Sequence, residues 1–182
     1  DSLVDGLTKV CEIILSTMGP FGNKVCIPDS TGTPTFSRDG VTVARALVSP
    51  FDATDGKDWK YKNMGARLVV DACDKTVKAG GDGTTTTAAL LRGFVKGVLD
   101  TNGNVNEVVA ALKAAVNEVH EQIDQMSRKP SQEELLNLTT VSANNNVELG
   151  KMIADLVWEL GEDAYIEPVP NMGETKTEII KR

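Results

Sequence analysis

Apolar residues at helical spacing run through most of this chain of 182 residues, and the longest such stripe lies between residues 105 and 126. Its members recur every three or four positions, which places them on one face of an α-helix. They are Val105, Val108, Val109, Leu112, Val116, Val119, Ile123 and Met126. A long helix with one apolar face must pack that face against other elements, so the stripe predicts a mainly α-helical protein.

The same spacing predicts further helices at residues 1–18, 41–47, 64–77, 84–99 and 147–160. Capping-box pairs, Asn104 with Glu107 and Ser131 with Glu134, mark the starts of the 105–126 helix and of a short helix after it. Two β-like runs, 24–27 and 35–37, flank a turn and predict one small hairpin. We expect two more strands at 164–167 and 176–180, and an irregular, polar segment at 49–62.

A change of pattern near residues 127–130 predicts a domain boundary there, which divides the chain into 1–129 and 130–182. The first part reads as a helical bundle with a hairpin, and the second as the start of an α+β domain. The chain begins inside a helical pattern and ends at Lys181 and Arg182 without a cap or turn signal. We therefore expect it to be a fragment.

Composition excludes several classes of function. The chain has 19 basic and 26 acidic residues, a net charge of -7, which disfavours binding to nucleic acid or to an anionic membrane. The single histidine, His120, lies within the long helical pattern beside no candidate nucleophile, which disfavours a serine or cysteine hydrolase. The three scattered cysteines, Cys11, Cys26 and Cys73, favour neither a disulfide framework nor a zinc site.

The strongest candidate for a ligand-binding segment comprises residues 80–87, with sequence GGDGTTTT, between two predicted helices. Glycines let a backbone approach a ligand closely, and the first turn of the next helix presents free N–H groups to an anion. Threonine hydroxyls beside those groups would suit phosphate oxygens. A carboxylate at Asp82 would repel phosphate unless a cation lay between them, which predicts a Mg²⁺ ligand. The alternative is a glycine-rich turn followed by threonines that only cap and pack.

Two shorter turns also carry polar groups. The sequence Thr17-Met18-Gly19-Pro20 offers carbonyls at a helix end, and taken alone it reads as a helix stop. The sequence Ser37-Arg38-Asp39-Gly40 places a carboxylate after the hairpin, and taken alone it reads as a helix N-cap.

In this order the three segments resemble the group I, GroEL-type chaperonins, and the resemblance covers nearly the whole chain. The matching stretches are residues 17–23 (TMGPFGN), 38–45 (RDGVTVAR), 63–66 (NMGA), 81–86 (GDGTTT) and 141–144 (VSAN). The aspartate-glycine-triple-threonine motif is specific to chaperonins as a class. The family usually has lysine at the position of Arg38, and residues 49–62 are longer than their counterpart.

The resemblance implies an equatorial, ATP-binding domain at 1–129 and the ascending part of an intermediate domain at 130–182. ATP phosphates would then be bound by Asp82, Gly83, Thr84, Thr85 and Thr86, with Asp82 on Mg²⁺. Thr17, Met18, Gly19 and Pro20 would line the other side of the nucleotide. K⁺ would be held by the carbonyls of Thr17 and Arg38 and the hydroxyl of Thr85. Asp39 would help to orient the attacking water.

The resemblance also implies that identical subunits form a heptameric ring or rings. The ring would hydrolyse ATP and assist the folding of unfolded client proteins. A co-chaperonin partner is possible under this resemblance. A cytoplasmic location is expected, with an organelle matrix or virus-infected host cytoplasm left open. The fragment alone should not turn over ATP. Two alternatives remain: a ring scaffold without ATPase activity, and an unrelated helical phosphate-binding module with a similar loop.

Overall fold

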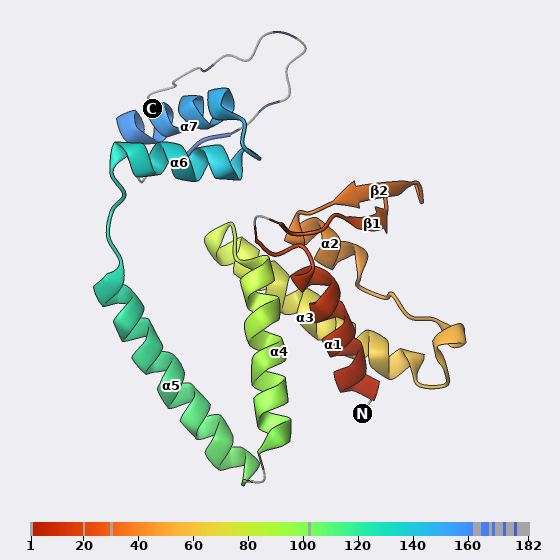
Figure 1. Ribbon diagram of the computed structural model, residues 1–182. Helices are drawn as coiled ribbons and strands as arrows, with labels where there is room; N and C mark the ends of the chain where they lie inside the picture. The colour runs from red at the N-terminus through yellow and green to blue at the C-terminus, as the bar shows by residue number, and fades with distance from the viewer. Residues whose placement is uncertain are drawn as a thin grey trace. The chain divides into compact units, whose positions relative to one another are not determined.

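The computed structural model describes residues 2–19, 21–29, 31–101, 103–161, 165–167, 169, 173 and 177. Within them the chain is mostly helical, with one two-stranded sheet (Figure 1). It divides into two compact units, Asp1–Ala115 and Val116–Arg182. None of the helices in the described ranges is long and apolar enough to cross a membrane. The mainly α fold with a small hairpin is confirmed, whereas the domain boundary near residues 127–130 stays a prediction.

Four helices form the core of the first unit. They are α1 (Ser2–Leu15), α2 (Gly40–Ala46), α3 (Trp59–Gly80) and α4 (Thr84–Asp100). Residues at helical spacing on α1 face the other three helices, because an i, i+3, i+4, i+7 pattern keeps side chains on one face. The buried cluster consists of Leu7, Val10, Cys11, Ile14, Val43, Ala44, Ala66, Val69, Cys73 and Ala88.

Helices α1 and α3 touch backbone to backbone. A Cβ atom placed on Gly65 would lie 2.0 Å from the carbonyl oxygen of Leu3 and 2.8 Å from the nitrogen of Leu7. One placed on Gly6 would lie 2.1 Å from the carbonyl oxygen of Lys62. Only glycine fits at these two positions. The close approach explains why the buried apolar stripes of the two helices interlock so fully.

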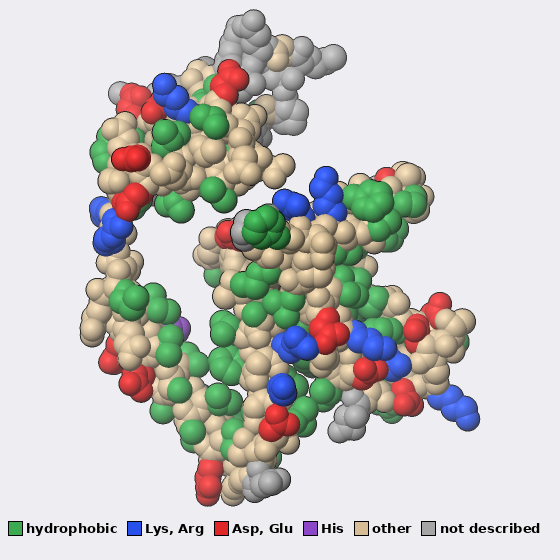
Figure 2. Space-filling view, viewed as in Figure 1, with side chains coloured by type: hydrophobic (Ala, Val, Ile, Leu, Met, Phe, Trp, Pro, Cys, Tyr) green, Lys and Arg blue, Asp and Glu red, His purple; other side chains and the backbone are tan. Residues whose placement is uncertain are grey.

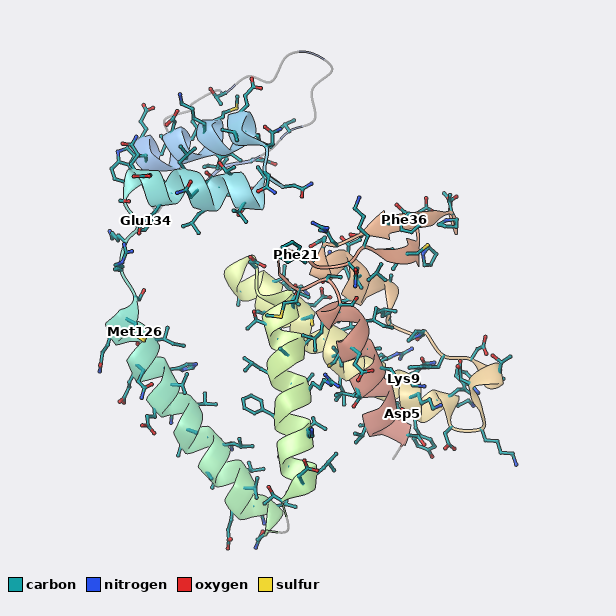
Figure 3. All side chains as sticks on the ribbon, in the orientation of Figure 1. Asp5, Lys9, Phe21, Phe36, Met126 and Glu134 are labelled. Atoms are coloured by element: carbon teal, nitrogen blue, oxygen red, sulfur yellow. The ribbon has the colours of Figure 1, made fainter. Side chains whose placement is uncertain are left out.

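Charged residues also connect these two helices at the surface. Figure 3 labels Asp5 and Lys9 on α1, which form an i, i+4 pair with a nitrogen–oxygen distance of 3.8 Å. The ammonium group of Lys62 on α3 lies 3.5 Å from the same carboxylate. The Asp5–Lys9 pair is exposed, and pairs of this kind contribute little to stability, so the glycine contacts and the apolar core dominate the packing.

The predicted hairpin is present. Strands β1 (Val25–Pro28) and β2 (Pro34–Ser37) pair antiparallel, with Val25 opposite Ser37 and Ile27 opposite Thr35. The turn between them is held by Asp29, whose carboxylate accepts hydrogen bonds from the N–H groups of Thr31 and Thr33. The hydrogen bond from the Thr31 hydroxyl to this carboxylate, followed by the two backbone bonds, lowers the pKa of Asp29.

The segment 49–62 is more ordered than the sequence predicts. Helix α3 begins at Trp59 rather than at residue 64, and a short 3-10 helix, η1 (Ala53–Asp55), precedes it. The cause is tertiary: the buried Asn63 side chain accepts from the N–H of Phe51 and donates to its carbonyl, at 3.1 and 2.9 Å. Phe51 also packs against the core. A role for this segment at a subunit boundary stays a prediction.

In the second unit, helices α6 (Gln132–Ser142) and α7 (Val147–Leu160) form a tight pair. The predicted capping box is present, with Ser131 and Glu134 each bonded to the other's backbone N–H. The bidentate contact with Arg128 is the largest cause that lowers the pKa of Glu134, to about 2. A Cβ atom on Gly150 would lie 2.6 Å from the Cα of Thr140, so these helices also meet at a glycine.

Two other predictions for the C-terminal region have different outcomes. Gly161 ends α7, as expected. Residues 165–167 have no regular secondary structure, and nearly all of the segment 176–180, the second predicted strand, lies outside the described residues. The α+β character of this part therefore stays a prediction.

Helix α5 (Val105–Met126) matches the predicted stripe, and the side chain of Asn104 accepts from the N–H of Asn106 at its start. Its apolar face, however, is exposed: Met126 is 81% exposed, and Figure 2 shows hydrophobic side chains at the surface along this helix. No residue of α5 is buried within the described part of the chain. The helix was predictable from the stripe, but its partner was not.

The contact between α1 and α3 can be tested with a pair of glycine substitutions. Gly65→Ala should lower the free energy of unfolding by about 3 kcal/mol, because its methyl group would overlap the backbone of α1. Gly97→Ala on α4 is the control, since a Cβ there meets nothing within 4 Å. It should raise stability by about 0.5–1 kcal/mol through helix propensity. Urea unfolding followed by circular dichroism measures both, and equal stabilities would contradict the packing argument.

Candidate functional site

The three polar turns found in the sequence lie toward one end of the first unit. The loop between α3 and α4, the turn before α2 and the turn after α1 are all at this end (Figure 1). They are brought there by the packing of α1, α2 and α4 on α3. The site is therefore formed by segments that are far apart in the sequence.

The loop between α3 and α4 depends on two glycines. Gly81 ends α3 with φ +79°, and Gly83 starts α4 with φ +100°. Both values lie in the left-handed region that other residues rarely adopt. Asp82 lies between them, exposed, and one of its oxygens accepts from the N–H of Gly83 at 2.6 Å. The loop thus presents one carboxylate at the start of a helix.

The start of α4 has free hydrogen-bond donors. Gly83 offers no side-chain cap, whereas Asp39, Ser131 and Asn146 cap helices α2, α6 and α7. The first backbone bond of the helix runs from the N–H of Thr87 to the carbonyl of Gly83, at 2.9 Å.

Within the described ranges, the N–H groups of Thr84, Thr85 and Thr86 have no protein acceptor, and the hydroxyls of Thr85 and Thr86 have no partner. Free N–H groups at the positive end of a helix dipole, beside free hydroxyls, form an arrangement that suits a phosphate.

Gly40 brings the turn before α2 against this loop. A Cβ atom on Gly40 would lie 2.9 Å from Oγ1 of Thr85 and 3.2 Å from Cβ of Thr84. Asp39 therefore lies next to a residue that contacts the threonine run. Sequence reasoning missed the role of Gly40, although its place directly after Asp39 was the available signal.

The Asp39 side chain has a defined orientation. Oδ2 accepts from the N–H of Thr42, at 3.1 Å, and from the hydroxyl of the same residue. The N–H of Asp39 donates to the hydroxyl of Ser37, at 3.1 Å. Asp39 is thus the N-cap of α2, as one reading of the sequence held, while its other oxygen has no partner in the described part of the chain. Its capping role leaves this oxygen available for a ligand or water.

The turn after α1 folds back on itself. Gly19 has φ +79°, and its carbonyl accepts from the N–H of Gly22 at 3.0 Å. A Cβ atom on Gly22 would lie 2.0 Å from the carbonyl oxygen of Thr17, so only glycine allows this fold. Thr17 is buried, and its hydroxyl donates to the carbonyl of Ile14. The hydroxyl is thus used internally, and the backbone is what this turn can offer.

The remaining predicted site residues are located as follows. Met18, Gly19 and Arg38 are exposed, and Pro20 lies outside the described residues. Phe21, labelled in Figure 3, is exposed as well. The grouping of the Thr17 and Arg38 carbonyls with the Thr85 hydroxyl around K⁺ stays a prediction.

The side chains of this region suit a metal ion that takes most of its ligands from a bound phosphate and from water. No group of three or more acidic, histidine or cysteine side chains that could hold a metal is present among the described residues. Mg²⁺ commonly uses one or two carboxylates and takes its other ligands from phosphates and water. The single carboxylate of Asp82 beside the free N–H groups of α4 fits that pattern.

Comparison with known proteins gives consistent results. The model of the TCP-1/cpn60 chaperonin family matches residues 10–178. The mitochondrial chaperonin HSP60 of Trypanosoma cruzi is 34% identical over 169 residues, which cover 91% of this chain and 29% of that protein. The hydrogenosomal chaperonin HSP60 of Trichomonas vaginalis is 33% identical, covering 91% of this chain and 34% of that protein. The chain thus spans about a third of these relatives.

Solved structures share the fold. The chaperonin gp146 from the bacteriophage EL 2 (Pseudomonas aeruginosa), solved in the presence of ATP-BeFx, matches with a TM-score of 0.71 and 23% identity. The match covers 91% of this chain and 28% of that one. A group III chaperonin in the open state matches with a TM-score of 0.69 and 22% identity, over 87% of this chain and 31% of that one.

Thiol reactivity tests the packing beneath the loop. Burial raises the pKa of Cys73 to about 11, as it does for Cys11, where neighbouring Cys73 adds to the effect. Cys26 is exposed. At about pH 8 a raised pKa of this size lowers the thiolate fraction about 100-fold, and burial blocks access as well. Iodoacetamide should therefore label Cys26 alone in the folded chain and all three after unfolding, as read by mass spectrometry. Rapid labelling of native Cys73 would contradict the structure.

Proposed function

The chain belongs to the TCP-1/cpn60 chaperonin family, and from this we propose that it is the part of an ATP-dependent chaperonin subunit that binds the phosphates of ATP. One observation carries the proposal: Gly40, the residue after Asp39, lies against the side chains of Thr84 and Thr85, so the turn that contains Asp39 meets the start of α4. An unrelated helical module with a similar loop would have no reason to bring these segments together. The HSP60 relatives agree with a chaperonin of group I.

The surroundings of each residue support a role for it in the proposed site. The N–H groups of Thr84, Thr85 and Thr86, with the free hydroxyls of Thr85 and Thr86, would hold the terminal phosphates. Asp82 would hold Mg²⁺, which neutralises phosphate charge when bound. Asp39, oriented by Thr42, would accept a hydrogen bond from the attacking water. Phosphoryl transfer requires positioning and charge neutralisation more than a strong base, and the site offers both.

The turn after α1 would form the opposite wall of the nucleotide-binding site. Thr17, Met18, Gly19 and Pro20 would contact it, chiefly through their backbone because the Thr17 hydroxyl is used internally. K⁺ would be held by the carbonyls of Thr17 and Arg38 and by the hydroxyl of Thr85. Carbonyl oxygens at the end of a helix favour a cation, which supports this part of the proposal.

A ring of identical subunits that assists the folding of client proteins is the activity we propose for the full-length protein. The relatives named as chaperonins support it, and the chain spans only about a third of them. A mitochondrial or hydrogenosomal location of relatives supports an organelle matrix as the location of this protein, with the cytoplasm as the other location.

The alternative function, a ring scaffold without ATPase activity, is disfavoured because Asp39, Asp82 and the threonines are all present.

Substitution of Asp39 tests the proposed role in hydrolysis. Asp39→Asn keeps an oxygen that can cap α2 but removes the charge that faces the water. ATP turnover of the full-length protein should fall about 100-fold or more, with MgATP affinity changed by less than about threefold. Steady-state ATPase assays and calorimetry measure the two quantities. Turnover close to that of the wild type would mean that Asp39 only caps the helix.

Substitution of Asp82 tests the proposed Mg²⁺ site. Asp82→Ala removes a charged ligand and leaves phosphate charge uncompensated in the loop, so MgATP affinity itself should fall about 10- to 100-fold. Asp71→Ala is the control, because Asp71 is an exposed carboxylate on α3 with no hydrogen bond or ion pair in the described part of the chain. Isothermal titration calorimetry of the full-length protein compares the two. Equal affinity of both variants for MgATP would show that Asp82 holds no Mg²⁺.

A further inference from the structure

Thr87, the fourth threonine of the run, has no part in the proposed phosphate site and contacts another helix. Its Oγ1 lies 2.9 Å from Oγ1 of Thr76 on α3. Both residues are half-buried, so this hydroxyl pair is partly shielded from water. Thr76 was not a candidate residue in the sequence, because nothing in a helical pattern marks one threonine as special.

The direction of this bond follows from the neighbours of Thr76. Its Oγ1 also lies 3.1 Å from the carbonyl oxygen of Ala72, which can only accept. A hydroxyl has one proton to donate. When Thr76 gives its proton to Ala72, it accepts the proton of Thr87, so Thr87 is the donor between the two helices. The hydroxyl proton of Thr87 is thereby committed to α3.

The same face of α3 lies against the start of α4 at two other points. The methyl carbon Cγ2 of Thr76 lies 3.2 Å from the position of a Cβ on Gly83. One turn earlier, the thiol of Cys73 donates to the carbonyl of Thr84, with a sulfur–oxygen distance of 3.6 Å. Residues three apart lie on one face of a helix, so Cys73 and Thr76 contact the turn together.

We propose that the Thr76–Thr87 hydrogen bond is a positioning contact for the phosphate site. It holds the first turn of α4 so that the N–H groups of Thr84, Thr85 and Thr86 are already oriented before a phosphate arrives. A turn that is ordered in advance loses less conformational freedom on binding, which raises affinity. This inference rests on the proposed function, because it assigns Thr76 a role in binding MgATP.

The test compares four variants of the full-length protein in calorimetry with MgATP. Thr76→Val and Thr87→Val each remove one hydroxyl at nearly constant volume, and each should weaken MgATP binding about fivefold. Because both break the same bond, the double variant should bind no more weakly than either single variant. Thr76→Ser keeps the hydroxyl and removes only the methyl group, so its affinity should stay close to that of the wild type.

Thr101→Val is the matched control at the other end of α4. The Thr101 hydroxyl donates to the carbonyl of Gly97, at 2.7 Å, so this variant also loses one hydroxyl bond to a backbone carbonyl. Its affinity for MgATP should not change. Melting temperatures of all variants separate positioning from stability, since a purely structural bond would lower the melting temperature and leave affinity unchanged.

The outcomes separate this inference from the proposed function. If the wild type binds MgATP and Thr76→Val binds it equally well, the positioning role is wrong while the proposed function stands. The same conclusion follows if the two valine effects add, or if Thr76→Ser is as weak as Thr76→Val. If the wild type does not bind MgATP, the proposed function fails and the positioning role fails with it.

Discussion

The contact between the backbones of α1 and α3 is the constraint on which the first unit depends. Gly6 and Gly65 remove the two Cβ atoms that would hold the helices apart. Once the backbones touch, the side chains from Leu7 to Ile14 reach across to α2, α3 and α4 and form one buried cluster. The ends of α1 and α3 are then fixed relative to each other, and the turns that follow them form the site. Packing far from the ligand thus determines where the polar groups lie.

Much of this fold could be predicted because its signals are local. Apolar residues at helical spacing predicted the helices, and the spacing of Ser131 and Glu134 predicted the start of α6. The start of α3 was missed because it depends on Asn63, which bonds the backbone of Phe51 across a turn of the chain. The stripe on α5 was identified correctly, but a stripe does not identify the surface that covers it. Local patterns predict elements, whereas contacts between distant residues determine where elements begin and what they face.

The site shows the same limit. The sequence allowed Asp39 to be a helix cap or a site residue, and the structure shows that one oxygen caps α2 while the other has no partner among the described residues. The approach of Gly40 to Thr85 could not be read from a sequence in which the two lie in different helices. The proposal assigns two exposed carboxylates, Asp39 and Asp82, to the surroundings of the phosphates. A triphosphate bound there would be repelled by both carboxylates unless cations lay between them, which is the physical reason that the proposal includes metal ions.

The run of four threonines is understandable from helix geometry. Successive residues of an α-helix point about 100° apart, so four in a row face nearly every direction around the axis. Thr84 is buried over Cys73, Thr85 faces Gly40, Thr86 is exposed and Thr87 contacts α3. The four residues therefore have different surroundings. Because threonine is a mediocre helix former, the run costs intrinsic stability at the start of α4. The hydrogen bonds of the Thr84 carbonyl with Cys73 and of the Thr87 hydroxyl with Thr76 offset that cost. They lie on the face of the turn that packs against α3, so the opposite face stays available for a ligand.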